Sequence, residues 1–556
     1  MRNIGTGISN WRLTATMVVL FMSMLTANLD TTILATAIPK ITDEFNSLDD
    51  MGWYGSSAFL TFAAFQTTWG KVFKYFNMKW SYALTIVIFE LGSIVCAVAQ
   101  NSTTLIVGRA IAGMGAAGLT TGTFVIIGYT VIEELRPAFM GVLGATYTLA
   151  SFVGPIVGGA FTERLTWRWC FWINLPIGGV ALALLIPFYR NPDHAKPLQA
   201  TWKETILQLD LVGSALVLAS VACFSLALQW GGLSKSWSNS DVIGTLVGFF
   251  VLAVVCGINE VWMGERASIV PRLLKVRRIL VNQFVVFLNS SGQFILVYYL
   301  PIYFQSLLND TPLQSAVHNL PFLVGGLFSM ASGALLTATN QWLPFLAPGA
   351  ALCAVGGGLI YTMDINTPTA KWAGYQLLAG SMTGFVSQIP IMANTAIVDM
   401  ADMGSTSAMT LLFQLLGGSF SVGAAQSIFS NLLLKHIAET APTISPTLVL
   451  ATGASGLRQA FTAEELPFIL DGYTKALKGA FALATAMMSA GCVAIAFFKW
   501  EKLRPDAPAA GEKALHEDTQ SAAVSSSAGE SSEGGNATVE NSEKPVQGDS
   551  VLETVN

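Results

Sequence analysis

The chain has 556 residues, of which 53% are hydrophobic and only 11% are charged, and its mean hydropathy is +0.56. Soluble domains carry about 25% charged residues, so this composition excludes a large soluble protein. The net charge of −5 is misleading, because the segment from Pro505 onwards contains ten acidic and two basic residues. The rest of the chain is slightly basic, and neither part predicts a nucleic-acid partner.

Runs of about 20 apolar residues indicate helices that span a lipid bilayer. We expect fourteen of them, at 13–37, 52–70, 80–100, 104–128, 138–161, 168–189, 207–229, 241–262, 280–304, 317–338, 344–363, 372–397, 406–433 and 474–498. The first run follows Trp11-Arg12 and contains Asp30, which favours a spanning helix over a cleaved signal peptide. The sequence therefore predicts an all-α polytopic membrane protein.

The runs divide the chain into five parts. They are an N-terminal segment (1–12), six spans (13–190), a pair of spans (207–262), six further spans (280–498) and a tail (499–556). The tail is rich in Ser, Glu, Gly and Ala, a composition typical of disorder.

Lysine and arginine gather in the connections on one side of the predicted membrane, most densely at 272–278 (RLLKVRR). Cytoplasmic loops are enriched in these residues, so we expect both termini in the cytoplasm. Asn101 and Asn309 begin glycosylation sequons on the opposite side. Both lie close to the membrane, and Pro312 follows the second sequon.

Three charged residues lie well inside predicted spans: Asp30, Glu90 and Arg109. A charge in hydrocarbon is costly and needs a partner or a watery cavity. Arginine does not lose its proton, whereas an aspartate or glutamate there is suited to load and release one. We expect Asp30, Glu90 and Arg109 to take part in proton coupling, against the simpler interpretation that they form structural hydrogen bonds.

The stretch from Leu105 to Phe161 contains Arg109 and then Gly154, Pro155, Gly158 and Gly159. Proline removes one helix hydrogen bond, and glycines allow close helix packing, so these four residues predict a bend at a helix contact. Generic packing would also explain the glycines alone.

The last six spans contain amides and aromatic rings in their interior, whereas the first six contain the three charged residues. Candidate cavity residues are Asn289, Gln293, Gln388, Asn394, Phe413 and Gln414. Each amide alone is explained by a bond between helices, but together they fit a cavity for an uncharged amphipathic molecule.

The six cysteines and four histidines are scattered without disulfide or metal-ligand spacing. No catalytic cluster is apparent, so we expect a protein without enzyme activity, cofactor or metal. A sensor that uses the tail as a signalling arm is a further alternative. We expect one chain to act alone in the bilayer.

Several motifs give the chain a specific resemblance, over nearly all of 13–498. The sequence LDTTILATAIP at 29–39 is similar to the first-helix signature of drug:proton antiporters, LIVGRAIAGMG at 105–115 to their fourth-helix motif, and GPIVGG at 154–159 to their fifth-helix motif. The run WRWCFWINLPIG at 167–178 resembles the 14-helix group, and TLLFQLLGG at 410–418 resembles fungal efflux pumps. The chain thus resembles the 14-helix drug:proton antiporters of the major facilitator superfamily.

This resemblance implies two six-helix bundles that rock about a central site, with export of a toxin, another secondary metabolite or a drug through the plasma membrane. A vacuolar porter of basic amino acids or a siderophore transporter of the same superfamily is the alternative. The sequence departs from the family pattern at 70–80 (GKVFKYFNMKW), where Lys74 occupies the position of a conformation-latching aspartate. A latch built on that aspartate is therefore not expected.

Overall fold

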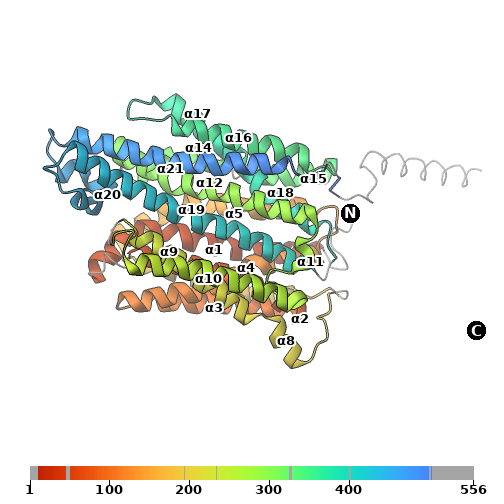
Figure 1. Cartoon of the computed structure of the whole chain (residues 1–556). Helices are drawn as coiled ribbons and strands as arrows, with labels where there is room; N and C mark the ends of the chain where they lie inside the picture. The colour runs from red at the N-terminus through yellow and green to blue at the C-terminus, as the bar shows by residue number, and fades with distance from the viewer. Residues whose placement is uncertain are drawn as a thin grey trace, which may run out of the picture. The chain divides into compact units, whose positions relative to one another are not determined.

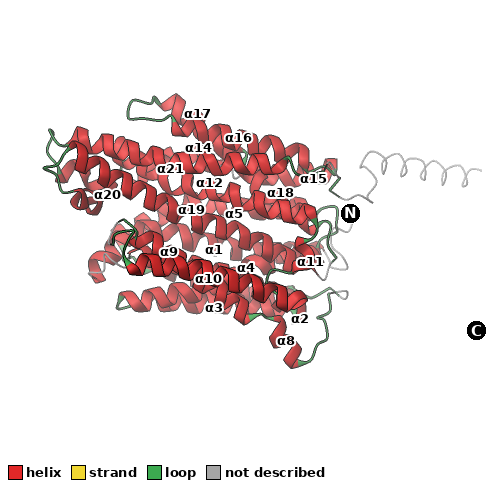
Figure 2. Ribbon diagram, in the orientation of Figure 1, coloured by secondary structure: helices red, strands yellow, loops and turns green. Residues whose placement is uncertain are grey.

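The computed structural model describes residues 10–45, 51–192, 195–232, 235–324, 328–399, 402–499 and 502–503. Over these ranges the regular structure is helical, as Figure 2 shows, and β-pairing is limited to two isolated bridges. The predicted all-α class is confirmed. The predicted acidic tail lies almost entirely outside the described residues.

The first bundle consists of α1 (Asn10–Phe45), α2 (Met51–Tyr75), α3 (Met78–Ala97), α4 (Ser102–Thr130), α5 (Arg136–Arg164), α6 (Trp169–Trp172) and α7 (Asn174–Phe188). The linker contains α8 (Trp202–Gln208), α9 (Leu211–Trp230), α10 (Ser240–Met263), the 3-10 turn η2 (Gly264–Arg266) and α11 (Pro271–Leu274).

The second bundle consists of α12 (Arg277–Leu307), α13 (Pro312–His318), α14 (Leu320–Val324), α15 (Phe328–Thr339), α16 (Leu343–Tyr361), α17 (Thr369–Ser381), α18 (Thr383–Thr395), α19 (Met403–Thr440), α20 (Pro446–Ala460) and α21 (Leu466–Ile495). Figure 1 shows the long helices running side by side.

Among the described residues, eleven segments are long and apolar enough to cross a membrane. They coincide with eleven of the fourteen predicted spans. The other three predictions fall on α2, which is less apolar, on α17 and α18, which are divided at Met382, and on the range of α14 and α15, where residues 325–327 lie outside the described part of the chain. The polytopic architecture is confirmed, and the count of fourteen stays a prediction.

Small residues on α4 bring three helices into close contact. A Cβ atom added at Gly115 would lie 2.5 Å from the backbone nitrogen of Phe89 on α3. One added at Gly113 would lie 2.2 Å from the carbonyl oxygen of Ala58 on α2. Both distances are far below van der Waals contact, so the glycines of α4 are required for this packing and hold Arg109 between α2 and α3.

The linker helices α9 and α10 pack against each other, and α9 also packs against α2 of the first bundle and α19 of the second. Asp210 caps α9 in a left-handed conformation (φ 45°) and accepts hydrogen bonds from the backbone nitrogens of Gly213 (2.9 Å) and Ser268 (2.8 Å). The linker pair therefore has its own buried anchor and contacts both bundles.

Candidate functional site

Arg109 is fully buried on α4 and uses its guanidinium group in two directions. Nη1 donates to the carboxylate of Asp30 on α1, and Nε donates to the carbonyl oxygen of Tyr54 on α2 at 3.0 Å. The ring of Phe171 lies 5.9 Å from the guanidinium carbon. The expensive buried charge is thus paired and hydrogen-bonded, as the membrane interior requires.

Asp30 has a second hydrogen-bond donor on the opposite side from Arg109. The Nδ2 atom of Asn174 on α7 donates to Asp30 Oδ1 at 3.2 Å and to the Ser93 hydroxyl on α3 at 3.1 Å. This single network connects α1, α2, α3, α4 and α7. We call the ion pair at its centre the Asp30–Arg109 pair. Of the three predicted intramembrane charges, the structure brings Asp30 and Arg109 together.

Glu90 does not join that pair. Its side chain lies on α3 against Gly178 of α7, and both carboxyl oxygens are buried with no hydrogen-bond partner in the described part of the chain. A bare carboxylate in this position has no compensation for its lost hydration.

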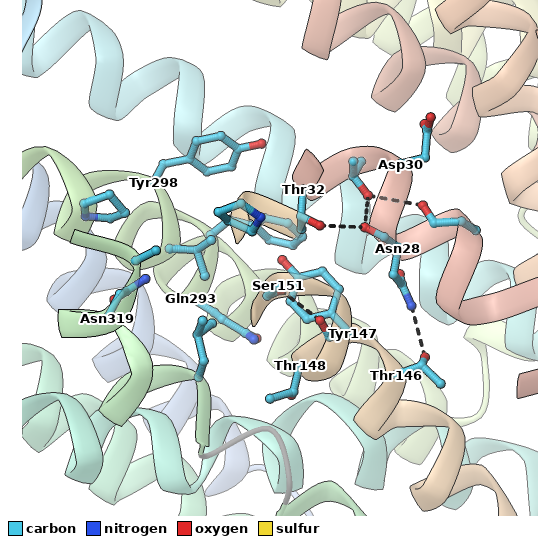
Figure 3. A pocket seen from close by; sticks show the side chains of 18 of the residues that line it. Asn28, Asp30, Thr32, Thr146, Tyr147, Thr148, Ser151, Gln293, Tyr298 and Asn319 are labelled. Atoms are coloured by element: carbon cyan, nitrogen blue, oxygen red, sulfur yellow. Dashed lines mark hydrogen bonds between the residues drawn. The ribbon is translucent and has the colours of Figure 1, made fainter. Parts of the chain in front are cut away.

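A large cavity, which we call the central cavity, lies between the two bundles. Its volume is about 1220 Å³, somewhat above the roughly 300–1,000 Å³ of most ligand pockets. Asp30 lines it at one side, and Figure 3 shows Asn28 and Thr32 of α1 near Thr146 and Ser151 of α5, with Gln293 of α12 across from them. The cavity combines such polar groups with aromatic rings, including Phe62, Tyr147, Phe294 and Tyr298.

The wall from the first bundle is held by hydrogen bonds between α1 and α5. Asn28 donates to the Thr146 hydroxyl at 3.1 Å, and Thr32 donates to the Ala150 carbonyl oxygen at 2.9 Å. In the wall from the second bundle, Ser387 donates to Gln293 Oε1 at 3.0 Å. The described residues leave Gln388 Oε1 and Gln414 Oε1 buried and without partners, so these two amides have hydrogen-bonding capacity left for a bound molecule.

The predicted cavity residues divide into two groups. Gln293, Gln388 and Gln414 line the central cavity, whereas Asn289, Asn394 and Phe413 are not among its lining residues.

The second group has other contacts. Asn394 bonds to Asn282 at 2.6 Å and to Thr410 at 3.0 Å. Asn289 donates to its own helix at Val285, and Phe413 packs in an apolar cluster with Met409.

Several lining residues were absent from the sequence-based candidates, chiefly on α5. They recur three or four residues apart, at Gly144, Tyr147, Thr148 and Ser151, and continue to Pro155 and Gly159. This spacing places them on one face of a helix, so a polar stripe leading into the GPIVGG motif was the available signal.

The four residues of that motif have different surroundings. A Cβ atom at Gly154 would lie 2.2 Å from Thr32 Oγ1, so Gly154 permits the contact between α1 and α5. Gly158 is buried, Pro155 and Gly159 line the central cavity, and a Cβ atom at Gly159 would meet nothing within 4 Å. Helix α5 runs through Pro155 without a break.

The two ends of the central cavity differ. Its lining reaches Lys40, Glu163, Arg164 and Thr311, which lie at the end of the bundles where α1 and α5 finish. The opposite end of the bundles carries Lys71, Lys74 and Arg272, and we call it the basic end. None of these three residues lines the cavity.

Contacts between the bundles close the basic end. Lys74 donates to Asp402 Oδ1 at 3.2 Å, and Arg272 donates to Asp402 Oδ2 at 2.7 Å. A Cβ atom at Gly70 on α2 would lie 3.0 Å from the Gly404 carbonyl oxygen on α19, so the two backbones nearly touch.

Asp402 is therefore not a solvated charge at a helix end. Its side chain is 13% exposed and lies at the start of α19. Burial alone would raise the pKa of Asp402, but hydrogen bonds and charges from Arg272 and Lys74 outweigh it, so the net effect is a lowered pKa. Lys74, at the position where the family pattern has an aspartate, thus forms an ion pair in which the residue on α2 is the cation.

The two sequon asparagines are exposed, and each has a defined local role. Asn101 caps α4 by accepting a hydrogen bond from the backbone nitrogen of Thr104 at 2.8 Å. Asn309 adopts a left-handed conformation (φ 59°) in the turn before α13.

Comparison with known proteins identifies the family. The model of the Major Facilitator Superfamily matches residues 20–422. An "MFS-type transporter GME11371" from Pestalotiopsis microspora is 44% identical over 501 residues, covering 89% of this chain and 92% of the relative. A "Dehydrocurvularin exporter" from Aspergillus terreus is 39% identical, covering 90% and 89%. A "Probable efflux pump gsfJ" from Penicillium aethiopicum is 44% identical, covering 89% of each chain.

Solved structures give the same fold. The proton:xylose symporter XylE, at 13% sequence identity, superposes with a TM-score of 0.57 over 89% of this chain and 97% of its own. The sequence-based family resemblance, and the expectation of a transporter in place of an enzyme, are both confirmed. The chain belongs to the Major Facilitator Superfamily and is a multi-pass efflux transporter related to those of fungi.

Proposed function

We propose that this transporter exports an uncharged, amphipathic organic compound in exchange for protons. The observation that carries the proposal is the position of Asp30, which lines the central cavity and at the same time binds the buried Arg109. A change in the charge of Asp30 therefore acts both on the substrate space and on the packing of five helices.

The central cavity supports the substrate class. Its aromatic rings suit flat apolar groups, while Gln388 and Gln414 have unused hydrogen-bonding capacity for hydroxyl or carbonyl groups. Several relatives bear the names of efflux pumps, and one is named for the export of dehydrocurvularin. We take a fungal secondary metabolite or a xenobiotic of similar chemistry to be the substrate.

Alternating access between two bundles is the mechanism that this fold supports. With both termini in the cytoplasm, the basic end faces inward and the central cavity is open to the outside. Proton binding at Asp30 would weaken its attraction to Arg109 and bias the equilibrium between the two conformations. Since one chain encloses the whole cavity, we propose that a monomer in the plasma membrane is sufficient and that the proton gradient replaces any cofactor.

The test is Asp30→Asn, which keeps an acceptor for Arg109 but removes the titratable group. In cells loaded with the fluorescent amphipath Nile red, we expect wild-type efflux to rise with an imposed inward pH gradient. The variant should reach the cell surface in normal amounts and show no gradient-driven efflux. Full gradient-driven efflux by Asp30→Asn would rule out Asp30 as the coupling group.

A further inference from the structure

The two acidic residues inside the first bundle have opposite surroundings. Asp30 accepts hydrogen bonds from Arg109 and from Asn174, so its negative charge is compensated. Neither carboxyl oxygen of Glu90 has a hydrogen-bond partner in the described part of the chain, and both are buried. Removing a carboxylate from water without a donor is far more costly than removing a neutral carboxylic acid.

The two acids are also ordered along the bundle. Ser93 on α3 contacts Asn174 on α7, beside Asp30. Glu90 lies three residues before Ser93 on α3, and it contacts Gly178, which lies four residues after Asn174 on α7. Three to four residues correspond to about one turn, or roughly 5.4 Å along a helix. Since α3 begins at the basic end, Glu90 lies one turn nearer to that end than the Asp30–Arg109 pair.

The elements packed against α3 offer Glu90 no compensating charge. Helix α7 contains no ionisable residue, and α6 contributes only Cys170. On α4, Arg109 is engaged by Asp30 and Tyr54.

The remaining nearby groups do not supply a donor either. Lys71 and Lys74 of α2 are bound to Glu265 and Asp402 at the basic end, and Asp30 on α1 carries the same sign of charge as an ionised Glu90. Asn174 Oδ1 is a further acceptor without a described partner. This part of the α3–α7 contact has acceptors in excess, and one added proton would supply the missing donor.

We propose that Glu90 is the residue that carries the exchanged proton in this conformation, as a neutral carboxylic acid, while Asp30 stays ionised against Arg109. A proton from water in the central cavity binds one Asp30 oxygen, and that O–H bond breaks as an O–H bond forms on one Glu90 oxygen, which returns Asp30 to its ionised form. When the basic end opens, that bond breaks and the proton passes to cytoplasmic water. The inference rests on proton-coupled export and adds Glu90 to it as a second proton-binding residue, one helical turn nearer to the basic end than the Asp30–Arg109 pair.

Infrared spectroscopy of the purified full chain in lipid nanodiscs tests the protonation state directly and needs no substrate. At neutral pH we expect a protonated-carboxyl stretching band that is lost in Glu90→Gln and retained in Asp30→Asn. Glu260→Gln is the matched control and should leave the Glu90 band in place, because Glu260 is also buried but lies on α10, where it accepts a hydrogen bond from the Ile269 backbone at 2.8 Å. An unchanged band in Glu90→Gln overturns the proposal.

Glu90→Asp guards against a folding defect, because it keeps a carboxyl group and should keep the band at a shifted frequency. In proteoliposomes, Glu90→Gln should lose Nile red transport driven by a pH gradient but retain Nile red exchange without one. If wild-type transport ignores the gradient, the proposed function fails. If the gradient drives Nile red transport equally in wild type and Glu90→Gln, the assignment of the exchanged proton to Glu90 is wrong.

Discussion

Arg109 draws its partners from two other helices, Asp30 on α1 and Tyr54 on α2. Breaking a buried ion pair by removing one partner costs about 3–5 kcal/mol, because the other charge is left unpaired. Removing the Asp30 side chain would therefore leave Arg109 unpaired, whereas Asp30→Asn keeps a hydrogen-bond acceptor for it.

Gly154 and Gly159 provide a matched pair of substitutions within one motif. Gly154→Ala would place a methyl group against Thr32 of α1, and such overpacking costs about 1–3 kcal/mol. Gly159→Ala meets open space and should gain up to about 1 kcal/mol of helix propensity.

Thermal unfolding in detergent should therefore separate the two variants, with Gly154→Ala melting lower than wild type and Gly159→Ala at or above it. Equal melting temperatures for both would show that the contact between α1 and α5 does not limit stability.

The identity of the residues in the ion pair could be predicted from the sequence, but their pairing could not. A charge inside an apolar run is conspicuous because it is costly there. Asp30 and Glu90 both lie well inside their spans, and only the rotation of α1 and α3 decides which one faces Arg109. Asn394 and Gln388 pose the same problem, because both lie on α18 and only one faces the central cavity.

At the scale of helices, the ion pairs at the basic end hold α2, α19 and the linker together. Lys74 and Asp402 are 18% and 13% exposed, and a partly exposed pair contributes about 0.2–1 kcal/mol. Because the pKa of Asp402 is lowered, this contribution is complete at neutral pH and is lost only as the pH falls through that lowered pKa.

Reversing one charge should open the basic end. In Lys74→Asp, two carboxylates would face each other, and we expect a several-fold shift toward the conformation open at that end, corresponding to about 1 kcal/mol. The double variant Lys74→Asp with Asp402→Asn removes the repulsion between the two carboxylates and keeps an acceptor for Arg272, so it should return most of the population. Spin-label distances across the basic end measure the shift. A double variant as open as the single one would exclude the direct pair.

The long helices could be predicted from apolar runs alone, since length and hydrophobicity decide which segments enter a bilayer. One division was not predicted. The run expected at 372–397 is divided at Met382, between α17 and α18. Hydropathy averages over such interruptions, because the residues at the break are themselves apolar or small.

At the scale of the molecule, the two bundles carry different chemistry. The charged network lies in the first bundle, while the second contributes amides such as Gln293 and Gln414 to the central cavity. The charged residues inside the apolar runs predict this contrast between the bundles for Asp30 and Arg109. The ion pair between Lys74 and Asp402 escaped prediction, because its members are 328 residues apart and the sequence around Lys74 departs from the family pattern.

The acidic tail gives a test at the same scale. A chain that ends at Arg504 loses the segment with ten acidic and two basic residues but keeps every contact described for the central cavity and the basic end. We expect gradient-driven Nile red efflux per transporter at the surface to match that of the full chain. Lost signalling with intact efflux would favour the sensor interpretation, and lost efflux would assign the tail a part in transport.

The anchoring of the linker has a consequence for biosynthesis. Thr68 and Ser214 share a hydrogen bond of 2.7 Å, and Lys71 donates to the Glu265 carbonyl oxygen at 2.8 Å, so α9 and η2 attach to the first bundle through residues that precede α12 in the chain. While the ribosome is still translating the second bundle, the first 275 or so residues already hold all the partners for these bonds. The contacts that cover this side of the first bundle are therefore available before α19 is made, and the second bundle assembles against a surface on which they can already have formed.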